Sequence, residues 1–187
     1  MLDALAVPAL APFLVDWPES DQRRATTPSP LPVLRWLPDA VSDAPHFSTD
    51  LVTAVARAAA SLTWCRTYRS EDLHPAFAEN YGWSELIGLR GPLASTRIAC
   101  GFLLLGPDTL YPSHRHPAEE VYVPLAGTAA WQQGDGHWHK QPPGTLIHHA
   151  CEEIHAMRTG ARPLLALYLW RGAGLAEKSR FEPPPAS

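Results

Sequence analysis

The sequence predicts a mainly β protein, an all-β sandwich or barrel, with a helical extension at its N-terminus. From Ser95 onward, short β-type runs alternate with turn signals such as Gly134-Asp135-Gly136, a spacing typical of antiparallel sandwiches and barrels. The first 45 residues hold many of the chain's 20 prolines, which restrict them to short helices and irregular segments. With 187 residues and 45% hydrophobic residues, the chain suits one domain with a sizeable core.

Composition excludes several classes of protein. The net charge of -4 comes without a basic stripe, so nucleic acid is not an expected partner. The apolar N-terminus lacks an early Lys or Arg and is interrupted by Pro8 and Pro12, which disfavours a signal peptide or a membrane span. The three cysteines are widely spaced, which favours a reducing compartment. We therefore expect a cytoplasmic protein without a membrane partner.

The predicted elements follow in chain order. Residues 1–45 predict one short helix and then an irregular wrap over the core, with a dimer contact or a lid as its expected role. Residues 49–62 give the strongest helix pattern, with Ser48 or Thr49 as the cap and apolar residues at helical spacing. Residues 64–92 lead into the sheet. The predicted strands lie within 97–106, 119–133, 137–149, 153–159 and 163–172.

These elements predict a division into an N-terminal extension (1–92), a barrel (93–172) and a C-terminal tail (173–187). The stretch 111–127 is the most informative part of the barrel. Two short strands around Pro117 would place alternate residues on one face, and that face would carry His114, His116, Glu120 and Tyr122. Val121, Val123 and Leu125 would pack on the other face. The polar face is either the wet side of an ordinary sheet or the lining of a metal site.

Two motifs favour the metal site. The spacing HxH(x3)E(x6)G from His114 to Gly127 resembles the first motif of the cupin superfamily, with Asp108 in place of an expected glycine. Its second motif, counted from Gly144, leads to Ala150, Glu152, His155 and Thr159. A rival register brings His148 near the ligand position but is off by one, so we favour His155. The resemblance implies a cupin barrel, a double-stranded β-helix of jelly-roll type.

Three imidazoles and one carboxylate suit one divalent transition metal ion, namely Fe²⁺, Zn²⁺, Mn²⁺, Ni²⁺ or Co²⁺, and spacing does not choose among them. The competing interpretation is a solvated strand face. We assign the second HxH, His137 and His139, to such a solvated face. His148 and His149 are expected to form an outer-face pair or to support the ligands from behind.

Tyr122 adds a phenol two residues beyond Glu120. A divalent cation lowers the pKa of a nearby phenol, so Tyr122 could ligate the metal or act as a general base. The alternative is an aromatic residue that simply lines the barrel.

The segments NYGWSELIGLRGP, LLLGPDTLYPSHRHPAEEVYVPLAGTAAW and PLLALYLWRG extend the resemblance over about residues 64–172. They resemble the cupin-type dimethylsulfoniopropionate lyases, which are metal-dependent enzymes that release dimethyl sulfide and acrylate. The resemblance implies metal ligands at His114, His116, Glu120 and His155. It also implies catalytic tyrosines at Tyr122 and Tyr111, and a substrate contact at Trp170.

The residue types suit that reaction. Metal coordination of the substrate carboxylate would acidify the adjacent CH₂, Tyr122 would remove the proton, and dimethyl sulfide would leave by β-elimination. Aromatic faces bind such cations, and the candidates for the sulfonium are Tyr111, Trp131, Tyr168 and Trp170. Each could instead belong to the core. Competing functions are a cupin dioxygenase or isomerase acting on another small organic acid, and a non-catalytic sensor cupin. We expect a small zwitterionic substrate and a homodimer.

Overall fold

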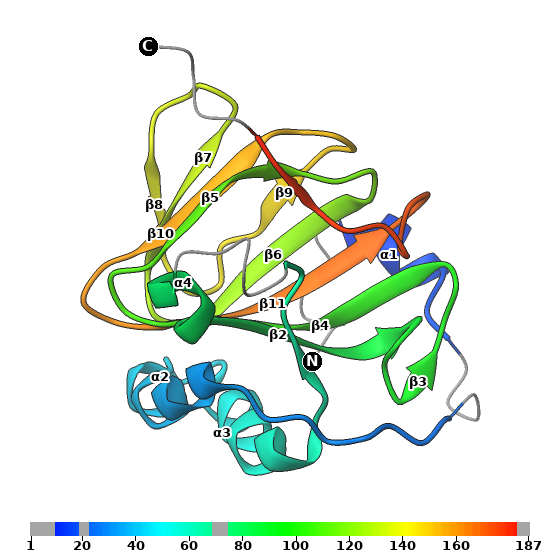
Figure 1. The fold of residues 1–187 in the computed structure, drawn as a ribbon, viewed down its shortest axis with the longest axis horizontal. Coiled ribbons are helices and arrows are strands. Elements are labelled where there is room, and N and C mark those ends of the chain that lie inside the picture. Colours follow the sequence, from blue (N-terminus) through cyan, green and yellow to red (C-terminus); the bar gives the residue numbers. More distant parts are fainter. Residues whose placement is uncertain (1–9, 19–22, 69–74, 183–187) are drawn as a thin grey trace.

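The computed structural model describes residues 10–18, 23–68 and 75–182, which form two β-sheets with helices against one of them (Figure 1). The larger sheet has the strand order β1-β2-β4-β11-β6-β9, and β3 pairs with β2. Its strands are β1 (Trp64–Cys65), β2 (Tyr81–Gly88), β3 (Leu93–Ala94), β4 (Ile98–Leu105), β6 (Glu119–Ala126), β9 (Ile147–His149) and β11 (Leu164–Arg171). The smaller sheet has the order β12-β5-β10-β7-β8. Its strands are β5 (Leu110–Arg115), β7 (Ala129–Gln133), β8 (His139–Gln141), β10 (His155–Thr159) and β12 (Arg180–Phe181).

The N-terminal helices cover the outer face of the larger sheet. The helical segments are α1 (Ala11–Val15), η3 (Pro32–Trp36), α2 (Leu37–Asp43), α3 (Thr49–Ala58), η4 (Ala59–Ser61) and α4 (Pro75–Glu79). Val33, Leu37 and Val52 share one apolar cluster with Phe102 and Leu104 of β4. In Figure 1, α2 and α3 lie together beneath β2 and β4. Among the described residues, no helix combines the length and the apolar character needed to cross a bilayer.

The helix predicted over 49–62 is confirmed, since α3 and η4 together span 49–61. Ser48 occupies the N-cap position, but its hydroxyl donates to the Leu125 carbonyl at 2.6 Å and thereby ties the helix to β6. Helix α2 was not predicted, because Pro38 looked like a helix breaker. Pro38 stands at the start of α2, where a missing N–H costs no hydrogen bond.

The strand alternation predicted for 119–126 is confirmed. Tyr122 packs in the cluster between the two sheets, whereas Val121 and Val123 pack on the outer face. The paired strands reach beyond the limits of 93–172 predicted for the barrel. On the N-terminal side β2 pairs with β4, and on the C-terminal side β12 pairs with β5. The closing residues 183–187 of the predicted tail lie outside the described residues.

Two residues keep a left-handed backbone where the sequence motifs expect glycine. Asp108 has φ 48° and Glu152 has φ 61°, and among the described residues they are the non-glycine positions with positive φ. Gly127, which closes the first motif, has φ 78°, and a Cβ there would lie 1.9 Å from the Pro163 carbonyl oxygen. The turns around the motifs therefore keep the conformation that glycine favours, even where the glycine itself is absent.

Candidate metal centre and its cavity

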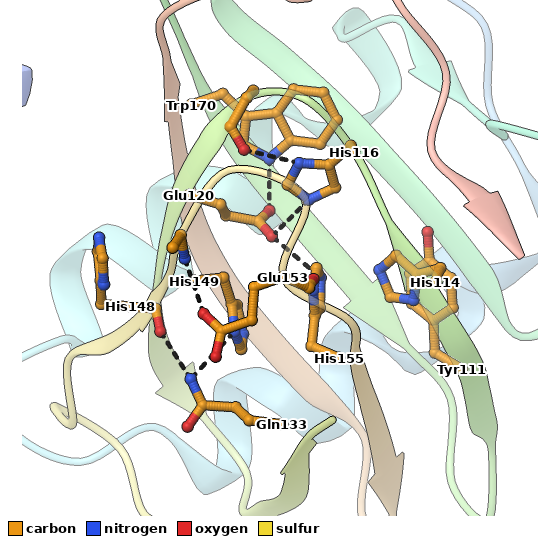
Figure 2. A network of polar contacts seen from close by, with 12 residues as sticks. Tyr111, His114, His116, Glu120, Gln133, His148, His149, Glu153, His155 and Trp170 are labelled. Carbon is orange, nitrogen blue, oxygen red and sulfur yellow. Dashed lines mark hydrogen bonds and ion pairs between the residues drawn. The ribbon is translucent and has the colours of Figure 1, made fainter. Parts of the chain in front are cut away.

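The buried side chains of His116, Glu120 and His155 converge between the two sheets (Figure 2). Each offers a ligand atom, and these atoms all lie within 4.8 Å of one another. The Nε2 atoms of His116 and His155 lie 3.0 and 3.3 Å from Glu120 Oε2. His116 directly follows β5, Glu120 belongs to β6 and His155 begins β10, so these strands bring together three of the four ligands that the sequence predicted.

Backbone carbonyls orient the three predicted histidine ligands in the same way. Nδ1 of His114, His116 and His155 lies 2.8, 2.9 and 2.8 Å from the carbonyl oxygens of Pro112, Ala118 and Glu153. A carbonyl only accepts a hydrogen bond, so each Nδ1 carries the proton and donates it. With the proton on Nδ1, the lone pair of the neutral form of each ring is on Nε2, as a metal-binding histidine requires.

This donor set fits a divalent transition metal ion. Two imidazole nitrogens and a carboxylate oxygen crowd one point, and their lone pairs repel unless a proton or a cation lies between them. Burial opposes ionisation of Glu120, but His116 and His155 outweigh it and hold the pKa of Glu120 well below its usual range. The buried His–His–Glu group can therefore hold a metal ion, with imidazole and carboxylate as its ligands.

His114 lies at the edge of this group. Its ring centroid is 4.2 Å from that of His155, and Tyr111 stacks on it at 4.0 Å with an interplanar angle of 7°. Burial and the neighbouring His155 hold the pKa of His114 well below 6.5, so its imidazole is neutral. A neutral ring with Nε2 unprotonated is competent to join the three converging ligands.

Glu120 has a ring side chain opposite it on each neighbouring strand. Opposite it stand Trp170 on β11 and His149 on β9. The Trp170 indole donates to Glu120 Oε1 at 2.5 Å, and its ring stacks on His116 at 4.2 Å. Trp170 therefore touches both the carboxylate ligand and an imidazole ligand, a closer involvement than the substrate contact inferred from the sequence.

His149 supports the ligands from behind, which was one of the two expectations for it. Its ring stacks on His155 at 4.0 Å and 11°, and its Nε2 is buried without a partner in the described part of the chain. His148 has the other expected role, because it is exposed and pairs with Glu119 at 2.8 Å on the outside. Consecutive residues of a strand point to opposite faces, so the two histidines separate.

A cavity of about 180 Å³ opens beside the ligands. The predicted site residues that line it are Tyr111, His114, Glu120, Tyr122, Tyr168 and Trp170. Trp131 is not among its lining residues. In the smaller sheet Met157 pairs with Tyr111 on one side and Trp131 on the other, so a buried methionine separates Trp131 from the cavity wall. Trp131 is a core residue.

A second part of the cavity lining was not predicted from the sequence. It comes from β1, β2 and the segment 175–179, and contributes Cys65, Arg66, Thr67, Tyr81, Trp83, Glu85, Leu175, Glu177, Lys178 and Ser179. The Tyr111 hydroxyl lies 3.3 Å from those of Tyr68 and Tyr81. The period-two alternation of Tyr81, Trp83 and Glu85 was the available signal. It was obscured because residues 64–92 looked like a connection.

The phenols of the cavity are protonated as the structure stands. Burial and the Glu120 carboxylate raise the pKa of Tyr122 well above 10, and burial raises that of Tyr81 to about 12. The lowered pKa expected for Tyr122 depends on a nearby cation that would offset both effects.

Other predicted features lie away from the cavity. His137 and His139 are exposed, as predicted. Among residues 10–18 and 23–45, none lines the cavity, and this part of the extension packs on the outer face of the larger sheet. The lid role expected for the extension is therefore not met by its described residues.

Comparisons with known proteins agree on one family. The family model for dimethylsulfoniopropionate lyase matches residues 15–166. The dimethylsulfoniopropionate lyase DddQ of Ruegeria pomeroyi is 36% identical over 171 residues, which are 88% of this chain and 82% of that relative. The crystal structure of DddQ matches with a TM-score of 0.87 and 32% identity, and covers 100% of this chain and 94% of that chain. A cupin-2 domain from Rhodospirillum rubrum matches with a TM-score of 0.52 and 15% identity, over 66% of this chain and 76% of that chain. The likeness confirms the predicted cupin fold.

Proposed function

The chain belongs to the dimethylsulfoniopropionate lyase family and is a carbon–sulfur lyase, and from this premise we propose that it cleaves dimethylsulfoniopropionate to dimethyl sulfide and acrylate. One observation carries the proposal. Glu120 of the buried His–His–Glu group, the neighbouring His114 and the Tyr122 phenol line the same small cavity, next to aromatic rings. A zwitterion with a carboxylate and a sulfonium needs both a metal-binding group and an aromatic surface.

His114, His116, Glu120 and His155 would hold one divalent transition metal ion, which is Fe²⁺, Zn²⁺, Mn²⁺, Ni²⁺ or Co²⁺. When bound, such an ion supplies Lewis-acid stabilisation of the negative charge that develops next to the substrate carboxylate. Two supports around the ligands favour this role. Trp170 fixes Glu120, and the backbone carbonyls of Pro112, Ala118 and Glu153 fix the three imidazoles.

Tyr122 is the proposed base. It is buried, lines the cavity and lies on the same face as Glu120. Its phenolate would take the proton from the carbon next to the carboxylate. The electron pair of that C–H bond forms the double bond of acrylate, and the C–S bond breaks with its electrons on sulfur. Dimethyl sulfide then leaves as a neutral molecule, so neither water nor an oxidant is consumed.

The aromatic side chains that line the cavity are the proposed surface for the sulfonium. Tyr111, Tyr168 and Trp170 all border the space next to Tyr122. Cations of this kind bind over aromatic faces. Tyr111 also stacks on His114, so it links the metal-binding end to the phenol network.

Headspace gas chromatography of the purified protein with dimethylsulfoniopropionate tests the proposal. We expect dimethyl sulfide and acrylate in equal amounts, loss of both after chelation, and recovery when a divalent metal is added back. Oxygen uptake, or a rearranged small organic acid without dimethyl sulfide, would instead favour a cupin dioxygenase or isomerase. No turnover with any of the five metals would favour a sensor. Cytoplasmic location and a homodimer remain predictions, for which fractionation and light scattering are the measurements.

A further inference from the structure

Glu85 is a buried carboxylate of β2, which belongs to the same sheet as Glu120 and Tyr122. It is 7% exposed and lines the same cavity as Glu120. Its Oε1 accepts hydrogen bonds from the backbone N–H groups of Arg90 and Gly91, the second at 2.9 Å. A Cβ at Gly88 would lie 2.7 Å from the same oxygen. The backbone of residues 88–91 therefore holds this carboxylate in one place.

The Glu85 carboxylate has no ion-pair partner among the described residues. Three cationic side chains also border the cavity. Arg66 is half-buried, whereas Arg90 and Lys178 are exposed, and the Arg90 guanidinium lies over the Trp83 ring at 5.9 Å. A buried charge is costly unless a partner compensates it. The cavity wall thus carries a negative charge that a bound cation would balance.

The position of Glu85 relative to Tyr122 follows from strand register. Glu85 of β2 is opposite Gly101 of β4, Gly101 is opposite Tyr168 of β11, and Tyr168 is opposite Tyr122 of β6. These residues form one row across four strands. Adjacent strands lie about 4.8 Å apart, so the Cα atoms of Glu85 and Tyr122 are on the order of 14 Å apart. Gly101 has no side chain, and β2 packs closely against it: a Cβ there would lie 2.9 Å from the Cα of Glu85.

We propose that Glu85 is a specificity-determining residue that receives the sulfonium of the substrate, with Trp83 and Tyr168 as its aromatic flanks. The inference rests on the proposed function and deepens it, because it assigns a direction to the substrate. The substrate carboxylate turns toward His116 and Glu120, and the cation turns toward Glu85. A sulfonium has no N–H or O–H to donate, so it is recognised through charge and aromatic faces alone.

The proposal has a consequence for product release. Cleavage of the C–S bond converts the cation into neutral dimethyl sulfide. The attraction to Glu85 exists for the substrate and vanishes for this product. The same carboxylate would discriminate against thioether acids, which have the shape of the substrate without its charge.

The variant Glu85→Gln tests the charge with little change in shape, because the amide oxygen can still accept from the N–H groups of Arg90 and Gly91. We expect the KM for dimethylsulfoniopropionate to rise by roughly tenfold or more, as for loss of an interaction with a charged group. The kcat should change far less. The inhibition constant of 3-(methylthio)propionate, which keeps the carboxylate but has a neutral sulfur, should stay within about twofold. Glu79→Gln, an exposed carboxylate on α4, is the matched control and should change neither value.

Two outcomes would overturn the proposal. Equal weakening of the sulfonium substrate and the neutral thioether acid would show that Glu85 only holds the loop 88–91. Unchanged values for both would show that its charge does not reach the substrate. Failure of the proposed function is recognised separately, because the wild-type protein would then release no dimethyl sulfide. In that case calorimetric binding of the same two ligands to wild type and Glu85→Gln still decides whether Glu85 selects the cation.

Discussion

The chain carries the His-x-His pattern twice, and the two copies have opposite environments. His114 and His116 are buried between the sheets, with His116 3.0 Å from Glu120. His137 and His139 are exposed. His139 belongs to β8, an edge strand that pairs with β7 alone in the described structure.

The difference between the two pairs comes from what surrounds them. Strand β5, which carries His114, is paired on both sides, and its neighbour β10 supplies His155 opposite His114. The carboxylate of Glu120 then arrives from β6 on the facing sheet. The edge strand of the second pair has no third ligand beside it within the described residues. Two histidines at this spacing form a candidate metal site when neighbouring strands place further ligating side chains beside them.

The largest expected effect tests the difference between the buried and the exposed His-x-His pairs directly. His116→Ala removes a converging ligand, so we expect the lyase activity to fall by more than ~100-fold together with the bound metal, since the metal supplies the charge stabilisation. His139→Ala should leave both unchanged. The measurements are dimethyl sulfide release and metal content by mass spectrometry. Equal effects of the two variants would contradict the assignment of the buried pair as ligands.

The buried pair also shares its face with a phenol, and the second expected effect concerns this group. Tyr122→Phe removes the proposed base but no proposed ligand. We expect kcat to fall by about 100-fold or more, the range of general-base catalysis, while the metal content stays at the wild-type value. Steady-state kinetics and metal analysis check this prediction. Activity close to wild type would remove Tyr122 from the role of base.

A third experiment sharpens the comparison with two adjacent histidines. His149 stacks on the proposed ligand His155, whereas His148 is outside. We expect His149→Ala to weaken metal binding by about tenfold, as is usual when a residue that orients a ligand is removed. His148→Ala should have no effect. Competition with a chromophoric chelator measures the affinity. Full affinity in His149→Phe, which keeps the stack, would identify the ring contact as the cause.

The smallest expected effect concerns the outer pair of His148 and Glu119. Burial opposes ionisation of Glu119, but hydrogen bonds from His148 and Arg171 outweigh it and lower its pKa below 4.5. Because the folded pKa is below the unfolded value, this stabilisation is present above pH 4.5 and is lost as the pH falls through the folded pKa. We expect at most about 1 kcal/mol, as for an exposed pair.

Denaturant unfolding of wild type and Glu119→Gln at pH 7 and pH 3.5 measures this difference. The difference between their free energies of unfolding should be largest at pH 7 and smaller at pH 3.5. A constant difference between the two proteins at both pH values would contradict the assignment.

Much of the barrel could be predicted, because alternation and turns are local properties of the sequence. Apart from β5, the strands from Ile98 to Arg171 fall within the predicted runs, and β5 corresponds to the first of the two short strands expected around Pro117. The Gly134-Asp135-Gly136 turn joins β7 to β8. Strand β2 escaped prediction. Its aromatic residues follow a segment rich in turn signals, and its place in the sheet depends on pairing with β4, which no local pattern reveals.

The residues of the site that belong to a spaced motif could be predicted from the sequence. Spacing and alternation identified His116, Glu120 and His155 because their separation along the chain follows from the fold. Trp131 shows the limit, since alternation indicates the face of a strand but not the row across the sheet, and Met157 lies between it and Tyr111. Glu85 carries no motif. Its burial and its missing partner are visible only when the loop 88–91 closes around it.

The three Nδ1 contacts with backbone carbonyls have a consequence for how the protein is supplied with its ion. The hydrogen bonds that orient His114, His116 and His155 come from residues two positions away on the same strand or turn. These hydrogen bonds form when the protein folds. The three imidazole side chains therefore have little rotational freedom left to lose when an ion binds. We expect loading to resemble the docking of an ion into a rigid receptor rather than metal-induced folding. Occupancy would then follow the ion concentrations of the cell, since affinities of such sites differ among divalent metals mainly in the general order for nitrogen and oxygen ligands.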